Sequence, residues 1–291
     1  MTLLRSLLFV PGNQPKMLEK ALGFAPDAVV PDMEDSVPPQ EKINARKVIA
    51  EHLPRLSEGG RVVIPRINAL DTGLVQDDLR AVISQHIFGV SIGKIQGVDD
   101  LVHVSQIIEK LEQEASLTPG VIKLIPWLET APSIINAYEI CKSSDRIVAV
   151  AFGAEDFAQD MGIERSEDEA ESLYVRQKIC VAARAADLLA LDTPYFKFKD
   201  DDGLRSNSLA ARALGFKGKF AIHPGQIEVI NRAFSPSEEE IEHAQRVVDA
   251  YEQAERMGRG STSLDGMVID VPVVKRARAT LEFVKADSSD Q

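Results

Sequence analysis

The sequence predicts a (β/α)₈ TIM barrel with a C-terminal helical lid extension. Short apolar or β-branched runs recur eight times along the chain, and segments with helical periodicity separate most of them. Parallel strands joined by crossover helices produce this alternation, and near-continuous apolar strands are typical of a sheet buried on both faces. Eight is also the number of strands that closes this barrel. The runs begin at Ser6, Asp27, Arg61, Gly89, Val121, Arg146, Leu188 and Lys219.

The segments between the runs supply the crossover helices. Helical periodicity covers Pro15–Phe24, Gln40–Leu53, Val98–Ala115, Ala131–Cys141 and Ser166–Ala186. An open doubly wound sheet shares this alternation and is the alternative fold. It is disfavoured, because the first strand-to-helix turn lacks the glycine-rich fingerprint of a dinucleotide fold. The barrel is therefore predicted to occupy residues 1–234 as the catalytic domain.

Residues 235–291 form the predicted extension and lid. A charged amphipathic helix is predicted over Ser235–Met257, opened by the cap-like sequence S-P-S-E-E. The Gly/Ser-rich stretch Gly258–Ser263 follows, and we expect it to be a mobile hinge or lid loop. The whole tail from Ser235 onward is too short for a core of its own. Its apolar side is therefore expected to pack on the barrel or on a neighbouring subunit.

The composition restricts the class of partner. The 291-residue chain carries a net charge of −12, whereas nucleic acids and anionic membranes are bound through basic surfaces. No apolar run approaches the length that spans a bilayer, and two cysteines are too few for a disulfide framework. We therefore expect a cytoplasmic protein that binds small molecules, with neither nucleic acid nor membrane as a partner.

Polar residues follow the predicted strands at the point where each strand ends. In a TIM barrel the active site lies at this carboxyl end. So many carboxylates around one mouth need a cation, and oxygen ligands without a Cys or His cluster favour Mg²⁺ or Mn²⁺ over Zn²⁺. Glu129 and Asp156 end the fifth and sixth strands and are the best pair of direct ligands. The predicted rim comprises Pro11–Asn13, Asp32–Asp35, Arg66–Asn68, Lys94, Glu129–Thr130, Glu155–Asp156, Asp192 and His223–Pro224.

Each rim residue also has a structural interpretation. A carboxylate that ends a strand is often the N-cap of the next helix. Arg66 can be a structural partner of Glu34 or Asp35, Lys94 can close a surface ion pair, and His223 can be an ordinary turn residue. Only their joint placement on one rim favours a functional site.

Seven segments of the chain carry a resemblance to a known family. They resemble, in order and with suitable spacing, the citrate lyase β-subunit-like family, which includes malyl-CoA and citramalyl-CoA lyases. The match extends from Arg5 to about Ala277. The segments are R-S-L-L-F-V-P-G (5–12), D-M-E-D-S-V (32–37), P-R-I-N (65–68), L-E-T (128–130), F-G-A-E-D (152–156), A-I-H-P-G-Q (221–226) and D-G-M-V-I-D-V-P (265–272).

The resemblance implies roles for the rim residues. Glu129 and Asp156 resemble the family's Mg²⁺ ligands, completed by substrate oxygens and water. Arg66 resembles the arginine that steadies a thioester enolate and helps to bind substrate. Glu34 and Asp35 resemble carboxylates that hold a metal-bound water or Arg66.

The resemblance also implies substrate and partner contacts. The backbone amides of Gly153, Ala154 and Glu155 resemble the cradle for the substrate carboxylate. Asp270, in the lid motif, resembles an acid/base that reaches the active site of an adjacent subunit, so a homo-oligomer is expected, a trimer or a multiple of it. The lid lacks the lysine that the family often carries beside the glycine. A surface for coenzyme A is implied at Arg5, Phe9, Pro11 and Lys16.

The implied activity is that of a Mg²⁺-dependent oxo-acid lyase. It would reversibly cleave a 3-hydroxyacyl-CoA of the malyl-, citramalyl- or citryl-CoA type to acetyl-CoA and a 2-oxoacid. Three alternatives stay open: a citrate lyase β subunit acting on citryl-acyl-carrier protein, a malyl-CoA thioesterase, and a catalytically inactive binding or regulatory protein. The sequence does not select the acyl group or its carrier.

Overall fold

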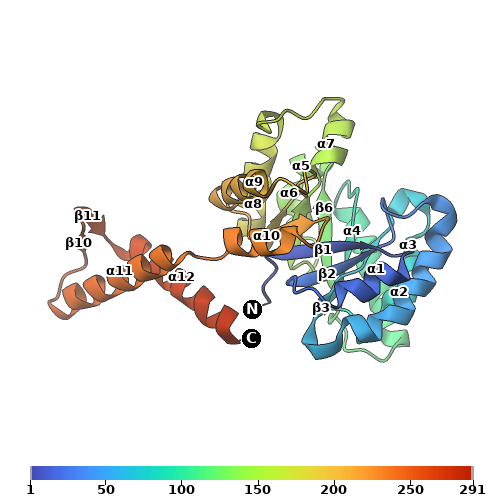
Figure 1. Ribbon diagram of the computed structural model, residues 1–291, viewed down its shortest axis with the longest axis horizontal. Coiled ribbons are helices and arrows are strands. Elements are labelled where there is room, and N and C mark those ends of the chain that lie inside the picture. The colour runs from blue at the N-terminus through green and yellow to red at the C-terminus, as the bar shows by residue number, and fades with distance from the viewer. Residues whose placement is uncertain (1, 290–291) are drawn as a thin grey trace. The chain divides into compact units, whose positions relative to one another are not determined.

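The computed structural model describes residues 2–289. The chain forms two compact units, Leu4–Phe234 and a C-terminal unit that begins at Ser235 (Figure 1). Within the described residues, no helix is long and apolar enough to cross a membrane.

The first unit is a closed barrel of parallel strands, as predicted. Each strand pairs with the next one around the ring, and β1 pairs with β2 to close it. The third barrel strand is in two pieces, β3 and β4, because Pro65 between them has no N–H for the ladder. All eight predicted runs form barrel strands. The strands are β1 (Ser6–Pro11), β2 (Ala28–Asp32), β3 (Val62–Val63), β4 (Arg66–Ile67), β5 (Gly89–Ile92), β6 (Lys123–Leu128), β7 (Ala149–Phe152), β8 (Leu189–Asp192) and β9 (Gly218–Ala221).

Helices follow the strands and cover the outside of the barrel. Four of them (α3, α7, α9 and α10) were not predicted. Two predicted segments differ from the structure: Ala131–Cys141 divides into two short helices at Asn136, and the helix predicted from Ser166 begins only at Leu173. The latter start is delayed because the backbone of Glu169 is left-handed, with φ 54°, which interrupts a helix, and a single 3-10 turn (Ala170–Ser172) comes before Leu173. The helices are α1 (Pro15–Ala21), α2 (Lys42–Leu56), α3 (Val75–Val82), α4 (Val98–Glu114), α5 (Ala131–Ile135), α6 (Ala137–Cys141), α7 (Ala154–Met161), α8 (Leu173–Ala185), α9 (Asp201–Leu214) and α10 (Gln226–Phe234).

Two apolar layers result from the alternation of side chains along the strands. On β1, Leu7 belongs to the cluster inside the barrel, and Leu8 belongs to the cluster between strands and helices. Within the barrel, the ring of Phe9 lies 5.9 Å from that of Trp127 and 5.1 Å from that of Phe220. The barrel is therefore filled by mainly apolar side chains and is not an open pore.

The C-terminal unit has a small core of its own. It consists of α11 (Glu238–Arg256), the hairpin β10 (Thr262–Leu264) and β11 (Met267–Ile269), and α12 (Val271–Ser289). The predicted cap is present, since Ser237 and Glu240 form a capping box. Apolar residues of the last hairpin strand and of α12 pack against α11, so the expectation that this tail has no core is wrong. The cluster comprises Ala244, Val247, Val248, Tyr251, Ile269, Val274 and Ala277.

A buried ion pair at the amino end of the barrel strands generates a stability prediction. The guanidinium of Arg146 lies 2.8 and 2.7 Å from the two carboxylate oxygens of Glu112. Glu112 is fully buried and also accepts from the amide of Ile122, just before β6. Glu112→Gln leaves Arg146 buried without a counter-charge, so the free energy of unfolding should fall by about 3 kcal/mol in urea denaturation.

Glu114→Gln on the same helix is the matched control. Glu114 faces Lys110 at 3.9 Å, and both side chains are exposed. Its substitution should change the free energy of unfolding by about 0.5 kcal/mol or less. Equal losses in the two variants would contradict a stabilising role for the buried pair.

Candidate functional site

Arg66 is held rigidly at the carboxyl end of the barrel. It begins β4 opposite Asp32, the last residue of β2. The guanidinium donates through Nε to Asp32 Oδ1 at 2.7 Å and through Nη2 to Oδ2 at 2.8 Å, and it lies 4.5 Å from the ring centroid of Phe9. Burial alone would raise the pKa of Asp32, but Arg66 holds it below its ordinary value. Both groups therefore stay charged, and the fork fixes the plane of the guanidinium.

The chain after β2 folds around the same aspartate. The amide of Glu34 donates to Asp32 Oδ1 at 2.9 Å. Lys42 Nζ donates to the carbonyl oxygens of residues 33 and 34, each at 2.7 Å. These contacts present the side chains of Glu34 and Asp35 to the mouth of the barrel.

Lys94 provides the second cation of the site. Its Nζ lies 3.3 Å from Glu34 Oε1, 3.4 Å from Asp35 Oδ1 and 3.9 Å from Asp156 Oδ1. Burial would lower the pKa of Lys94, but these three carboxylates raise it above its ordinary value. The arrangement goes beyond a simple surface ion pair, because one ammonium serves three carboxylates from the ends of two strands.

Glu129 sits deepest in the rim. It follows β6, is only 3% exposed, and accepts the backbone amide of Lys94 on Oε1 at 2.6 Å. A Cβ at Gly153 would lie 1.9 Å from Glu129 Oε2, and one at Gly93 would lie 2.8 Å from Oε1. Two positions without side chains therefore make the room that this carboxylate occupies.

Three carboxyl groups of the rim resist ionisation. Burial raises the pKa of Glu129 to about 8, and the charges of Asp156 and Glu34 add to the increase. Burial raises the pKa of Glu34 to about 7 against the opposing effect of Arg66. The pKa of Asp156 is also raised, again mainly by burial. A cation placed among these groups would favour their ionised forms.

The oxygen donors of the rim fit a hard divalent cation. Within residues 2–289, no three His, Cys, Asp or Glu side chains form a ready-made metal cluster. Glu129 and Asp156 could supply two carboxylates and leave the other positions to substrate and water, as Mg²⁺ sites commonly do. The predicted amide cradle is less open than expected, because the amide of Ala154 donates to Thr193 Oγ1 at 3.2 Å.

The structure does not bring Arg5 to this rim. Arg5 precedes β1, so it lies at the amino end of the barrel, where its guanidinium pairs with Asp27 at 2.9 Å. Phe9 lies inside the barrel beneath Arg66. Pro11 ends β1 and Lys16 is exposed on α1, so these two lie at the carboxyl end.

Some residues of the predicted rim have structural contacts instead. Asp192 is buried between the barrel and its helices, where it pairs with Lys219 and Arg176. Asn68 donates to the buried carboxylate of Asp78 at 2.6 Å. Their inclusion among the residues of the mouth is wrong: Asp192 is an outward-facing strand position that points at the helix layer, and Asn68 follows β4 and turns towards α3.

His223 and Asp270 also have local partners. The ring of His223 stacks on Phe198 at 5.1 Å, and its Nδ1 accepts the amide of Gly225 at 3.1 Å. Asp270 is exposed in the C-terminal unit and accepts the amide of Val273 at 3.3 Å, so it caps α12.

Sequence reasoning missed the role of Asp32. It placed this residue at the mouth but assigned Arg66 to Glu34 or Asp35 as partners. The sequence contained a signal for this pair: Asp32 ends one apolar run, and Arg66 interrupts the next. Only the β2–β4 register shows that the two face each other.

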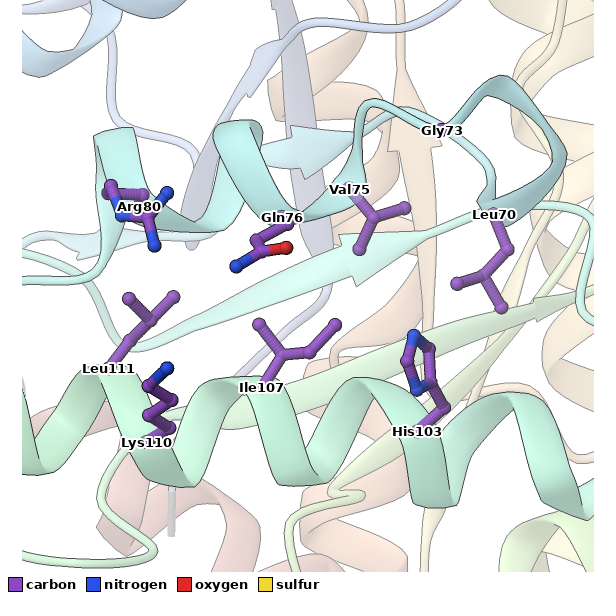
Figure 2. Close-up of a pocket in the computed structure, with 9 residues that line it drawn as sticks. All are labelled: Leu70, Gly73, Val75, Gln76, Arg80, His103, Ile107, Lys110 and Leu111. Carbon is purple, nitrogen blue, oxygen red and sulfur yellow. The ribbon is translucent and has the colours of Figure 1, made fainter.

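A separate pocket of about 250 Å³ lies on the outside of the barrel, between α3 with its preceding turn and α4 (Figure 2). His103, Ile107 and Lys110 of α4 face Val75 and Gln76 of α3 across it. None of its lining residues was predicted as a site residue, and the rim carboxylates do not border it.

The closed barrel and its rim define a TIM-barrel protein with a cluster of oxygen donors at the carboxyl end of its strands. Residues 5–224 match the profile of the HpcH/HpaI aldolase/citrate lyase family. The chain belongs to this family, and the predicted membership is confirmed.

Relatives with three different activities have similar sequence identity to this chain. The citrate lyase subunit beta of Leuconostoc mesenteroides subsp. cremoris is 35% identical over 97% of this chain and 94% of its own length. The mitochondrial citramalyl-CoA lyase of Rattus norvegicus is 34% identical over 94% and 84%. A (3S)-malyl-CoA thioesterase of Cereibacter sphaeroides is 36% identical over 97% and 95%.

Solved structures agree with the fold. The protein CitE of Mycobacterium tuberculosis, in complex with magnesium, acetoacetate and coenzyme A, superposes with a TM-score of 0.79 at 29% identity, covering 96% of this chain and 97% of that one. The citrate lyase beta subunit of the same organism, complexed with oxaloacetate and magnesium, gives a TM-score of 0.67 at 29% identity over 79% and 96%.

The raised pKa of Glu129 predicts a pH dependence of stability. Because it is raised from 4.5 to about 8, the folded protein holds a proton that the unfolded chain releases. The contribution to stability is present below the lower value and is lost as the pH rises through the higher one. In EDTA, the free energy of unfolding should fall less steeply across this range in Glu129→Gln than in the wild type. Identical slopes in urea titrations would contradict the assignment.

Proposed function

We propose that this protein is a Mg²⁺-dependent carbon–carbon lyase. It would reversibly cleave a 3-hydroxyacyl-CoA to acetyl-CoA and a 2-oxoacid. The observation that carries the proposal is the joint placement of Glu129 and Asp156 beside an arginine whose plane is fixed by Asp32. Named lyases of this family with nearly full-length similarity support it.

Glu129 and Asp156 would hold the metal, which, when bound, would act as a Lewis acid towards the substrate oxygens. The hydroxyl proton of the substrate must be accepted as the carbon–carbon bond breaks. Glu34 lies at the mouth beside Arg66 and Lys94 and would be ionised with a cation bound, so it could accept this proton. Asp35 would assist by holding Arg66, whose Nη1 lies 3.1 Å from its carboxylate.

Arg66 would stabilise the thioester enolate that departs. Asp32 occupies Nε and Nη2, and Nη1 faces the mouth beside Glu34 and Asp35. A donor fixed in this way needs no reorganisation when charge develops on the oxygen. The amides of Gly153 and Glu155, at the start of α7, would bind the substrate carboxylate, assisted by the positive end of that helix.

Asp270 would protonate the carbon of the enolate in the site of an adjacent subunit. Apolar side chains flank it: Met267 is 60% exposed, Val268 71% and Val271 46%. A homo-oligomer, a trimer or a multiple of it, would bury this surface. The coenzyme A moiety would lie along Phe9, Pro11 and Lys16.

Two further activities deserve equal testing, because relatives that carry them are equally similar. One is a citrate lyase β subunit acting on a citryl group carried by an acyl-carrier protein. The other is a thioesterase acting on malyl-CoA. Both would use the same rim, and they differ in the carrier and in the final product.

The deciding experiment offers malyl-CoA, citramalyl-CoA and citryl-CoA to the purified protein with Mg²⁺. A lyase releases a free 2-oxoacid and acetyl-CoA, whereas a thioesterase releases free CoA and a hydroxydiacid. Glu129→Ala and Asp156→Ala should each abolish turnover while leaving the circular dichroism spectrum unchanged. Wild-type activity that persists in EDTA would overturn the metal-dependent mechanism.

The shared site can be tested with two inactive variants. Asp270→Asn lacks the proton donor and Glu129→Ala lacks a metal ligand. Mixed oligomers of the two should regain part of the wild-type rate, because some sites combine a sound metal pair with a sound Asp270 from another chain. Mass spectrometry of the mixture shows whether subunits exchange. Exchange without any recovered activity would restrict Asp270 to its own chain or to capping α12.

A further inference from the structure

A long segment at the carboxyl rim carries one of the two proposed ligands. Residues 153–172 connect β7 to α8 and comprise α7, with Asp156 in its first turn, followed by largely irregular chain. A side chain on such a segment keeps its place only if contacts from outside hold the segment. Three sets of contacts do so.

The start of the segment is held by β8. The amide of Ala154 donates to Thr193 Oγ1 at 3.2 Å, and Thr193 is buried directly after β8. This contact fixes the first residue of α7, two residues before Asp156.

The middle of the segment is tied to the strand end that carries the other ligand. Asp160 Oδ2 accepts the backbone amide of Ala131 at 2.7 Å. Asp160 lies one helical turn after Asp156, and Ala131 opens α5, two residues after Glu129. A single hydrogen bond therefore joins the two pieces of chain that bear Glu129 and Asp156.

The end of the segment is held by Glu169, whose backbone is left-handed with φ 54°. Its Oε1 accepts from Arg165 at 2.8 Å, and its Oε2 accepts from Arg176 at 2.8 Å and from Asn207 Nδ2 at 2.9 Å. Arg165 also pairs with Glu155 at 2.6 Å, across the segment.

The third set of contacts continues into the interior of the protein. Arg176 Nη2 lies 3.0 Å from Asp192 Oδ2, and Lys219 donates to the same carboxylate. All three side chains are buried. Asp192 and Thr193 are consecutive, so the end of one strand holds both ends of the rim segment.

The main effect of this network is to fix the positions of the groups that it connects, and its net contribution to stability is small. Burying ion pairs adds little net stability compared with apolar packing, but removing one partner is costly. Such a network strongly favours one arrangement of the groups that it connects. Here it connects the rim segment to β8 and β9, on which neither proposed ligand lies.

We infer that Asp160 and the chain Glu169–Arg176–Asp192 are positioning residues that set the distance between Asp156 and Glu129. The inference rests on the proposed metal site and assigns roles to residues that touch neither metal nor substrate. Loss of an outer contact of this kind commonly lowers metal affinity by roughly 10–100-fold.

The first test compares Asp160→Ala with Asp160→Asn by calorimetric titration with Mg²⁺ alone. Asparagine keeps an oxygen that can accept from the amide of Ala131, whereas alanine does not. The alanine variant should bind Mg²⁺ about tenfold or more weakly, and the asparagine variant should stay close to the wild type. An equal loss in both would mean that the charge of Asp160 matters, and no loss in either would mean that it is only structural. Each of these two results would overturn the positioning role of Asp160.

The second test compares Glu169→Gln with Glu112→Gln, which disturbs a buried ion pair at the opposite end of the barrel. Both should lower the melting temperature, but only Glu169→Gln should weaken Mg²⁺ binding at a temperature where both variants are folded. Equal Mg²⁺ affinities would overturn the role of Glu169. If Glu169→Gln does not fold, the Asp160 pair decides the question.

The two levels of the proposal can be separated. The wild type should bind Mg²⁺ and Glu129→Ala should not. A wild type that binds no Mg²⁺ would overturn the proposed function and the positioning role with it. A wild type that binds Mg²⁺ with unaltered affinity in Asp160→Ala and Glu169→Gln would overturn the positioning role alone.

Discussion

Burial of several carboxyl groups at one end of the barrel, with repulsion between them adding to its effect, is the constraint on which the rest of the site depends. Glu34, Asp35, Glu129 and Asp156 share this end, and the two nearby cations, Arg66 and Lys94, do not suppress the raised pKa values of Glu34 and Glu129. Like charges at this spacing in a partly buried site favour protonation or a bound cation. These carboxyl groups therefore fit the proposed site for a divalent ion, because a bound cation would favour their ionised forms.

The barrel meets this constraint because fixed contacts hold the charged groups Asp32 and Arg66 in place. Asp32 is committed to Arg66, so it is charged but does not compete for a metal. Arg66 in turn lies over the ring of Phe9, which stacks on Phe220. These apolar rings lower the local dielectric constant and so strengthen the electrostatic interactions of Arg66. The strand ends thus divide the carboxylates into one that orients a cation and others that remain available.

Much of the fold follows from the sequence, because a strand buried on both faces must be apolar throughout and eight such runs are present. The site is only partly predictable. Sequence places a residue at a strand end, but the side that it faces depends on the pleat and register of the strand, which is why Asp192 lies in the helix layer. Arg5 precedes its strand and so lies at the amino end. The network around Glu169 joins residues distant in sequence, and no local pattern shows it.

The close approach of Gly153 to Glu129 links two positions that are 24 residues apart in the sequence. A methyl group at position 153 would overlap the carboxylate of Glu129. A side chain at position 153 and a carboxylate in this place therefore exclude one another. A related chain that carries a larger residue at the first position must have displaced or discarded the acid at the second. This glycine, which has no functional group, therefore serves as a marker for relatives that keep an acid in the position of Glu129.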